Sequence, residues 1–245
     1  MGSEYTAIAS MYDSFRGESP NMWAAYIDEL FGIYAEKKPV SVIDLCCGTG
    51  TVTGAMCRLG YNMTGVDLSE DMLALAQKNA PGALLIHQDM RSLQLYGGYD
   101  ACISCLDSIN YLPCEDDVIR TFSSVNRYLC DGGLFVFDVN TESRFRNKYG
   151  NNDFILENKD GLIAWSCEYH PRLKRCDFYL SCFTLDKDGR YTRRDEEQSE
   201  YCYSDAFLRE AARRSGFETI TALGRMSLSS PEKDEEKIHY VLRKI

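Results

Sequence analysis

Apolar and polar positions follow two patterns along the chain, and each pattern predicts one kind of secondary structure. Short apolar runs typical of buried strands occupy residues 42–45, 63–67, 83–87, 100–105 and 133–140. Between these runs, apolar residues recur at helical spacing, as at Val118, Phe122 and Val125. Strands that alternate with helices predict a mostly parallel sheet with helices on both faces.

The two ends of the chain extend this pattern. Residues 1–36 carry an apolar face at helical spacing that includes Trp23, Ile27 and Leu30, and they predict an N-terminal helical cap. A helix over residues 205–214 and two strands over residues 217–223 and 237–243 close the chain. The strand count of the sheet is therefore seven.

Residues 150–203 have a different character. Residues 163–169 and 177–185 have the composition of strands, and Asp188-Gly189 is typical of a tight hairpin turn. These signals predict an antiparallel β insertion of about four strands. The predicted organisation is a core formed by residues 1–149 and 204–245, with residues 150–203 as a small insertion.

Composition narrows the class of protein. The chain has 245 residues, of which 44% are hydrophobic, and no apolar run approaches the ~20 residues that a membrane span needs. The N-terminus lacks the pattern of a signal peptide. The eleven cysteines include a C-x-x-C pair, Cys102 and Cys105, but residues three apart on a strand point to opposite faces. We expect a cytoplasmic protein with reduced thiols and no metal.

The formal net charge of −10 argues against a nucleic-acid partner, because such binding relies on lysine and arginine to neutralise phosphates. The arginines between residues 190 and 214 are interleaved with acids, as a solvated face would be.

Residues 44–50, which read DLCCGTG, end the first predicted strand and precede a segment compatible with a helix. Gly48 and Gly50 allow the backbone to pass close to a ligand. A carboxylate, Asp67, ends the second strand and is placed to bind ribose hydroxyls. A dinucleotide-binding turn would need a third glycine at position 53, but Thr53 stands there and Gly54 comes one place late. This weakens the hypothesis of a nicotinamide-dependent oxidoreductase.

The segment 44–50 instead resembles motif I of the class I S-adenosyl-L-methionine (SAM) methyltransferases. Further family landmarks follow in order: Asp67, the tripeptide 88–90 (QDM) after the third strand, the segment 106–112 after the fourth, and the fifth strand. The resemblance extends over nearly the whole chain except residues 150–203. It implies a Rossmann-like α/β fold, SAM as methyl donor and S-adenosyl-L-homocysteine as product.

The resemblance also implies roles for residues near the strand ends. The backbone of the glycine turn meets the methionine part and ribose, Leu68 and Met90 flank the adenine, and Asp89 receives its amino group. Tyr12 either touches the cofactor or packs its helix onto the sheet, and Asp44 orients the loop or the SAM ammonium. The complete set of expected cofactor residues is Tyr12, Asp44, Cys46, Gly48, Thr49, Gly50, Asp67, Leu68, Met72, Asp89, Met90, Leu106 and Asp107.

The methyl acceptor is less defined. The N/D-P-P-Y signature of enzymes that methylate amide or adenine nitrogens is missing after the fourth strand, and the acids after Pro113-Cys114 argue against a cytosine-C5 enzyme. If the acceptor needs a general base, the candidates are Tyr111, Asp107 and His170, with Tyr169 as a further possibility. The aromatic-rich insertion would form an acceptor lid or a homodimer surface.

The leading hypothesis is a methyltransferase that acts on a nitrogen or oxygen nucleophile of a small molecule by in-line displacement. Two alternatives stay open: a methyltransferase for tRNA or protein, and a SAM-binding protein without catalytic activity.

Overall fold

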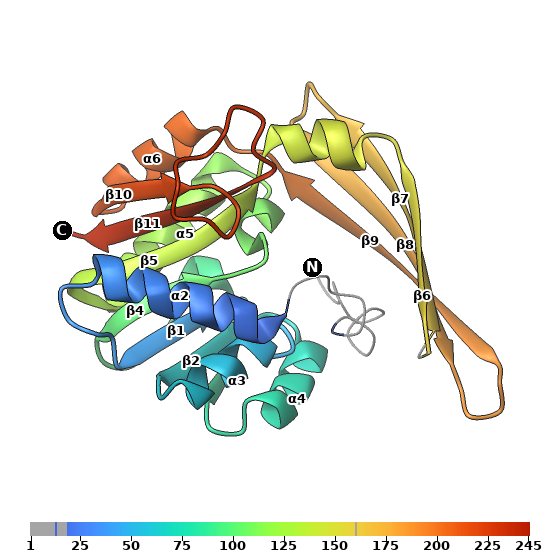
Figure 1. The fold of residues 1–245 in the computed structure, drawn as a ribbon, viewed down its shortest axis with the longest axis horizontal. Helices are drawn as coiled ribbons and strands as arrows, with labels where there is room; N and C mark the ends of the chain where they lie inside the picture. Colours follow the sequence, from blue (N-terminus) through green and yellow to red (C-terminus); the bar gives the residue numbers. More distant parts are fainter. Residues whose placement is uncertain (1–12, 14–18, 160) are drawn as a thin grey trace.

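The computed structural model describes residue 13, residues 19–159 and residues 161–245. Its centre is a seven-stranded sheet with the order β10-β11-β5-β4-β1-β2-β3 (Figure 1). Its strands are β1 (Ser41–Leu45), β2 (Asn62–Asp67), β3 (Leu84–His87), β4 (Tyr99–Ser104), β5 (Leu129–Asn140), β10 (Phe217–Leu223) and β11 (Lys237–Lys244). Strands β1 to β5 are parallel, whereas β11 is antiparallel to both of its neighbours. The predicted fold class is confirmed.

Helices cover both faces of this sheet (Figure 1). Helices α2 (Pro20–Tyr34), α3 (Thr51–Arg58) and α4 (Glu70–Asn79) lie on one face, and α5 (Glu115–Tyr128) and α6 (Asp205–Arg214) lie on the other. Local capping signals explain two of the helix starts. The hydroxyls of Ser69 and Ser204 accept hydrogen bonds from backbone N–H groups in the first turns of α4 and α6.

Strand β5 begins at Leu129, four residues before the predicted start. Leu129 pairs with Tyr99 of β4, and the register then shifts before regular pairing resumes at Leu134. Gly132, with φ 77°, lies inside this irregular stretch. The glycine run is therefore a bulge within a strand and not a turn before one, because pairing with β4 continues on both sides of it.

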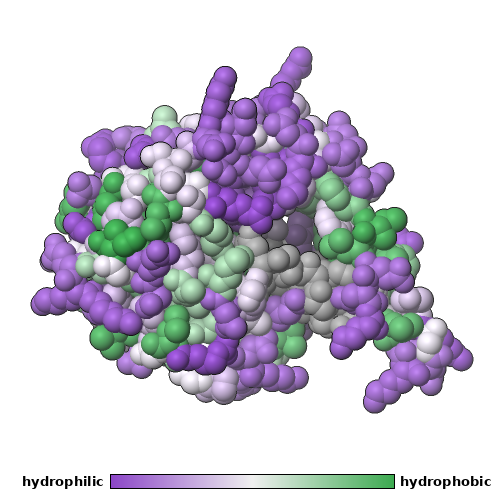
Figure 2. All heavy atoms as spheres, in the orientation of Figure 1, coloured by the Kyte–Doolittle hydropathy of each residue, from purple (hydrophilic) through white to green (hydrophobic). Residues whose placement is uncertain are grey.

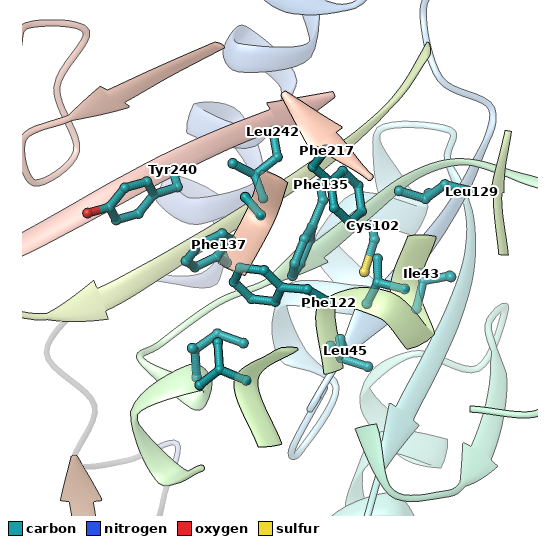
Figure 3. Close-up of a cluster of buried hydrophobic side chains, with 14 of the residues drawn as sticks. Ile43, Leu45, Cys102, Phe122, Leu129, Phe135, Phe137, Phe217, Tyr240 and Leu242 are labelled. Atoms are coloured by element: carbon teal, nitrogen blue, oxygen red, sulfur yellow. The ribbon is translucent and has the colours of Figure 1, made fainter. Parts of the chain in front are cut away.

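Two apolar clusters hold the sheet and its helices together. Figure 3 shows the cluster beneath α5 and α6, where the ring of Phe122 lies 5.4 Å from that of Phe135 and 5.1 Å from that of Phe137. The cluster on the opposite face includes Trp23 of α2 and Val136 of β5. Successive residues of β5 thus face opposite layers, as the two-residue period of a strand requires.

The insertion is a separate four-stranded antiparallel sheet that follows the π-helical turn η3 (Arg144–Tyr149). Its strands are β6 (Asp153–Asn158), β7 (Gly161–His170), β8 (Arg175–Leu185) and β9 (Tyr191–Tyr201). The predicted turn between β8 and β9 contains Gly189 at φ 77°. Figure 2 shows a largely hydrophilic surface on which hydrophobic side chains form separate patches, one of them over the strands of the insertion. The predicted antiparallel insertion is confirmed.

The cysteines are all free thiols. No group of three or more potential metal ligands occurs within the part of the chain that the structure describes. Among the described helices, none is long and apolar enough to cross a membrane.

Gly54 provides a test of the packing between α3 and α4. A Cβ atom at Gly54 would lie 2.2 Å from the carbonyl oxygen of Asn79 at the end of α4. We expect Gly54→Ala to lower the free energy of unfolding by about 1–3 kcal/mol, although alanine is the better helix former. Gly32→Ala is the matched control, because Gly32 is exposed in α2 and a Cβ there would meet nothing within 4 Å. Denaturant unfolding followed by circular dichroism checks both variants, and equal effects would contradict the packing argument.

Candidate functional site

The loop after β1 turns sharply because three of its residues have positive φ. Cys46 has φ 59°, Gly48 φ 54° and Gly50 φ 72°. A Cβ at Gly50 would lie 2.7 Å from the Cβ of Ala76, so glycine is required there for α3 to pack on α4. A Cβ at Gly48 would meet nothing within 4 Å. The backbone at Gly48 is therefore bordered by open space that a ligand can approach.

Asp67 ties the end of β2 to this loop. Its Oδ2 accepts a hydrogen bond from the backbone N–H of Gly48 at 2.7 Å, and its Oδ1 accepts one from the N–H of Ser69 at 2.9 Å. Burial raises the pKa of the Asp67 carboxyl, while these backbone donors favour its ionised form. Each oxygen keeps a further lone pair, so the carboxylate can still accept hydrogen bonds from two hydroxyls.

Asp44 lies beneath the loop and not at its surface. It is 2% exposed and accepts a hydrogen bond from the Thr53 hydroxyl in α3. Burial raises the pKa of Asp44 to about 7, and the charge of Asp67 acts in the same direction. These contacts fit the predicted orientation of the loop by Asp44.

Above the loop, the Thr49 hydroxyl donates a 2.8 Å hydrogen bond to the carboxylate of Asp13. The segment before α2 therefore touches the motif I loop at this residue. The neighbouring Tyr12 lies outside the described residues, and its role stays a prediction.

The predicted adenine residues lie beyond the ends of β2 and β3. Leu68 is 53% exposed, so its side chain is accessible to a ligand. Met90 is half-buried, and its sulfur lies 3.4 Å from the thiol of Cys46. The Met90 thioether and the Cys46 thiol thus place polarisable sulfur atoms beside the loop.

Asp89 and Met72 are more constrained than the sequence indicates. Both carboxylate oxygens of Asp89 accept hydrogen bonds from Arg91, which also binds Asp117. The Arg91 guanidinium holds the pKa of Asp89 below its usual value. Met72 is buried in the first turn of α4, where its backbone N–H donates a hydrogen bond to the hydroxyl of the N-cap residue Ser69. Their cofactor roles stay predictions.

The turn after β4 contains two successive non-glycine residues with positive φ, Leu106 at 63° and Asp107 at 58°. Such a conformation costs about 1–3 kcal/mol for each residue and persists only where its surroundings impose it. The backbone N–H of Asp107 donates to Oδ2 of Asp138 at 2.9 Å, and the ammonium of Lys237 donates to both carboxylates. Three strand ends thus meet at one buried ion cluster.

Lys237 is 3% exposed, so its charge needs strong compensation. Burial disfavours the charged form, but Asp107 and Asp138 outweigh it and hold the pKa of Lys237 above its usual value. No local signal in the sequence marks Lys237, which is 130 positions from Asp107 and stands at the start of the last strand.

A second polar network joins β5 to the end of β9. The Asn110 side chain donates to the carbonyl oxygens of Asn140 and Tyr201 and accepts from the N–H of Asn140. The Asn140 amide in turn donates to Oε2 of Glu200 at 2.7 Å. Glu200 is 4% exposed, and burial raises its pKa to about 8. The signal in the sequence for this network is Asn140, a polar residue at the end of an apolar strand.

The structure separates the three candidate bases. Tyr111 lies in the turn η2 (Ser108–Tyr111), and its hydroxyl donates to the side-chain oxygen of Gln198 in β9 at 3.1 Å. Asp107 belongs to the ion cluster. His170 lies elsewhere, because the register of β7, β8 and β9 aligns it with Arg175 and Tyr201, on the sheet face opposite to Glu200.

His170 is instead held by acids on its own face. Its Nε2 atom lies 3.1 Å from Oδ2 of Asp177 and 3.8 Å from Oε1 of Glu168. The structure therefore does not bring His170 together with Tyr111 and Asp107, because alternate residues of a strand point to opposite faces.

Comparisons with known proteins agree on one kind of domain. The family described as "Methyltransferase domain" matches residues 42–133. The Bacillus subtilis (strain 168) protein named "Putative methyltransferase YqeM" is 28% identical over 98% of this chain and 97% of its own. A malonyl-[acyl-carrier protein] O-methyltransferase of Bacillus cereus is 30% identical over 83% of this chain and 72% of its own.

Two further similarities are to a sugar methyltransferase in sequence and to a solved methyltransferase in structure. A dTDP-3-amino-3,4,6-trideoxy-alpha-D-glucopyranose N,N-dimethyltransferase of Streptomyces venezuelae is 30% identical over 53% of this chain and 56% of its own. The crystal structure of a SAM-dependent methyltransferase from Clostridium acetobutylicum ATCC 824 matches with a TM-score of 0.87 and 28% identity, covering 98% of each chain.

The ion cluster yields a stability prediction. We expect Lys237→Met to lower the free energy of unfolding at pH 7 by about 3–5 kcal/mol, because the buried carboxylate of Asp138 and the half-buried one of Asp107 lose their cation. Adding Asp138→Asn to this variant should recover part of the loss, since one uncompensated charge is removed. Lys233→Met, at an exposed position of the preceding loop, is the control. Thermal and denaturant unfolding measure all three, and a loss equal to that of the control would rule out a stabilising role for the cluster.

Proposed function

Since the chain belongs to the class I SAM-dependent methyltransferases, we propose that it transfers the methyl group of SAM to a nitrogen or oxygen atom of a small-molecule acceptor. The observation that carries the proposal is the meeting of the Gly48 loop, Asp67 and the strained Leu106–Asp107 turn at the carboxyl ends of β1, β2 and β4. Ligands of open α/β sheets bind at this edge.

The residues at this edge fit SAM. The open space beside Gly48 admits a ligand close to the backbone, and the spare lone pairs of Asp67 match a pair of ribose hydroxyls. Leu68 and Met90 would flank the adenine. When bound, SAM supplies a methyl group activated by the positive charge of its sulfonium.

The chain's own contribution is alignment and exclusion of water. In-line displacement requires the acceptor lone pair, the methyl carbon and the leaving sulfur to be collinear, and rigid positioning can supply much of the rate enhancement. The Leu106–Asp107 turn is rigid because Lys237 and Asp138 hold it. The contact of Tyr111 with Gln198 ties the insertion to the same edge, which supports a role as an acceptor lid over one as a homodimer surface.

Charge and relatives support a small acceptor. The net charge of −10 opposes a polyanionic substrate such as tRNA. Two of the relatives act, by their names, on an aminosugar nucleotide and on a malonyl group carried by acyl-carrier protein. The free cysteines suit a reducing compartment such as the cytoplasm.

A methyl-transfer assay tests the acceptor class. The purified protein is incubated with SAM labelled in its methyl group and a cell extract, which is then separated into small molecules and macromolecules. We expect label in the small-molecule fraction. Label confined to macromolecules would instead indicate RNA or protein as acceptor, and SAM binding without any transfer would indicate a protein that has lost catalysis.

Asp67 provides a direct test of the cofactor site. We expect Asp67→Ala to weaken SAM binding more than tenfold, because charge-assisted hydrogen bonds worth about 1.5–3 kcal/mol are lost. Asp71→Ala is the control, since Asp71 is an exposed acid in the first turn of α4. Isothermal titration calorimetry measures both affinities. An affinity equal to that of the wild type would refute the ribose role of Asp67.

A further inference from the structure

Glu200 stands where the insertion returns to the core. It is the penultimate residue of β9, and the amide of Asn140 at the end of β5 binds its Oε2 atom at 2.7 Å. The register pairs Glu200 with Cys176 and Cys176 with Tyr169, so Glu200 shares the face of the insertion that carries its buried apolar side chains. A buried carboxyl group therefore faces the carboxyl edge of the main sheet beside β5.

Two buried acceptor atoms near the end of β5 lack a donor, one of them on Asn140, which binds Glu200. Oδ1 of Asn140 and Oδ1 of Asp138 accept no hydrogen bond from the described residues, and both side chains are fully buried. The two residues are two positions apart on β5 and so share a face. A buried acceptor without a donor is destabilising, and a ligand that brings N–H groups would satisfy it. An ammonium group offers three donors and no acceptor.

The charges around Glu200 come from several elements. Asp107, after β4, raises the pKa of Glu200 in addition to the larger effect of burial. The Asn140 amide, Lys237 of β11 and Arg144 of η3 oppose this rise. Tyr149 of η3 and Cys176 of β8 also lie within electrostatic range. Once Glu200 is ionised, three carboxylates face two cations, so this region favours a cationic ligand, and the positive charge of such a ligand would in turn favour the ionised form of Glu200.

We propose that the acceptor is a primary or secondary amine and that Glu200 is its general base, an inference that rests on the proposed function. The Glu200 carboxylate takes one N–H proton from the bound ammonium, which leaves a neutral amine with a free lone pair. That lone pair forms the new N–C bond with the methyl carbon as the C–S bond breaks, and the bonding electrons stay on the sulfur of S-adenosyl-L-homocysteine. The product carries the positive charge as an N-methylammonium.

The conservative variant Glu200→Gln separates chemistry from structure. Glutamine keeps the shape and can still accept a hydrogen bond from Asn140, but it cannot take a proton. We expect transfer to the small-molecule fraction of a cell extract to fall by about 100-fold or more at pH 7, with SAM affinity unchanged by calorimetry. At about pH 10, many amines are already neutral, so the methyl-transfer rate of the variant should approach that of the wild type.

Two controls accompany this variant. Glu197→Gln makes the same substitution on the opposite, exposed face of β9 and should leave both SAM binding and transfer unchanged. In a second arm, the small-molecule fraction is treated with an N-acetylating reagent before the assay, which removes the nucleophilic lone pair of amines. We expect this treatment to abolish incorporation of label, while a mock-treated fraction retains it.

The outcomes separate this inference from the proposed function. Label that persists after acetylation would overturn the amine acceptor and leave a small-molecule methyltransferase in place. A Glu200→Gln variant with the wild-type rate at pH 7, or with equal inactivity at pH 7 and 10, would overturn the role as base. No label in the small-molecule fraction with wild-type protein would overturn the proposed function itself, and this inference with it.

Discussion

The ammonium of Lys237, which lies between two carboxylates, is the interaction on which the edge of the sheet at β4, β5 and β11 depends. It binds Asp107 at the end of β4 and Asp138 in β5, so that one charge fixes three strands. Desolvation of an isolated lysine would cost several kcal/mol, and the two acids offset that cost only in this geometry. In return, the cluster holds Leu106 and Asp107 in left-handed conformations that neither residue favours. A site that must align reacting atoms in a line benefits from a turn that cannot relax.

The insertion is joined to this edge by hydrogen bonds of a different kind. Asn110 reaches the carbonyl oxygen of Tyr201, Asn140 binds Glu200, and Tyr111 binds Gln198. The amide and hydroxyl donors in these contacts are uncharged, whereas the cluster around Lys237 is ionic. One face of the insertion is therefore apolar along β7 and β8 but polar where β9 meets the core. Because this face changes from apolar to polar, it can pack on a core at one end and offer hydrogen-bonding side chains at the other.

Local signals in the sequence predicted much of the fold. The Asp188-Gly189 turn and the alternation of apolar runs each depend on residues a few positions apart, and the structure contains both. The predicted start of the fifth strand was wrong, because pairing with a strand distant in the sequence outweighed the local signal. The glycine run of residues 132–133 has the composition of a turn, but pairing between Leu129 and Tyr99 continues the strand through it. Gly54, one place late for a dinucleotide motif, instead allows α3 to approach the end of α4.

The sequence by itself determined the family and the sheet, and it placed Gly48 and Asp67 together, because parallel strands always bring their carboxyl ends to one edge. Only the tertiary structure decided which polar side chains meet at the ends of β4, β5 and β11. Lys237 lies 130 positions from Asp107, and Glu200 lies 60 positions from Asn140. Hydrophobic periodicity indicates which face of an element is buried, but it does not encode which distant polar side chain will meet it. The same limit explains His170, whose register in the insertion directs it away from the edge that its residue type had suggested.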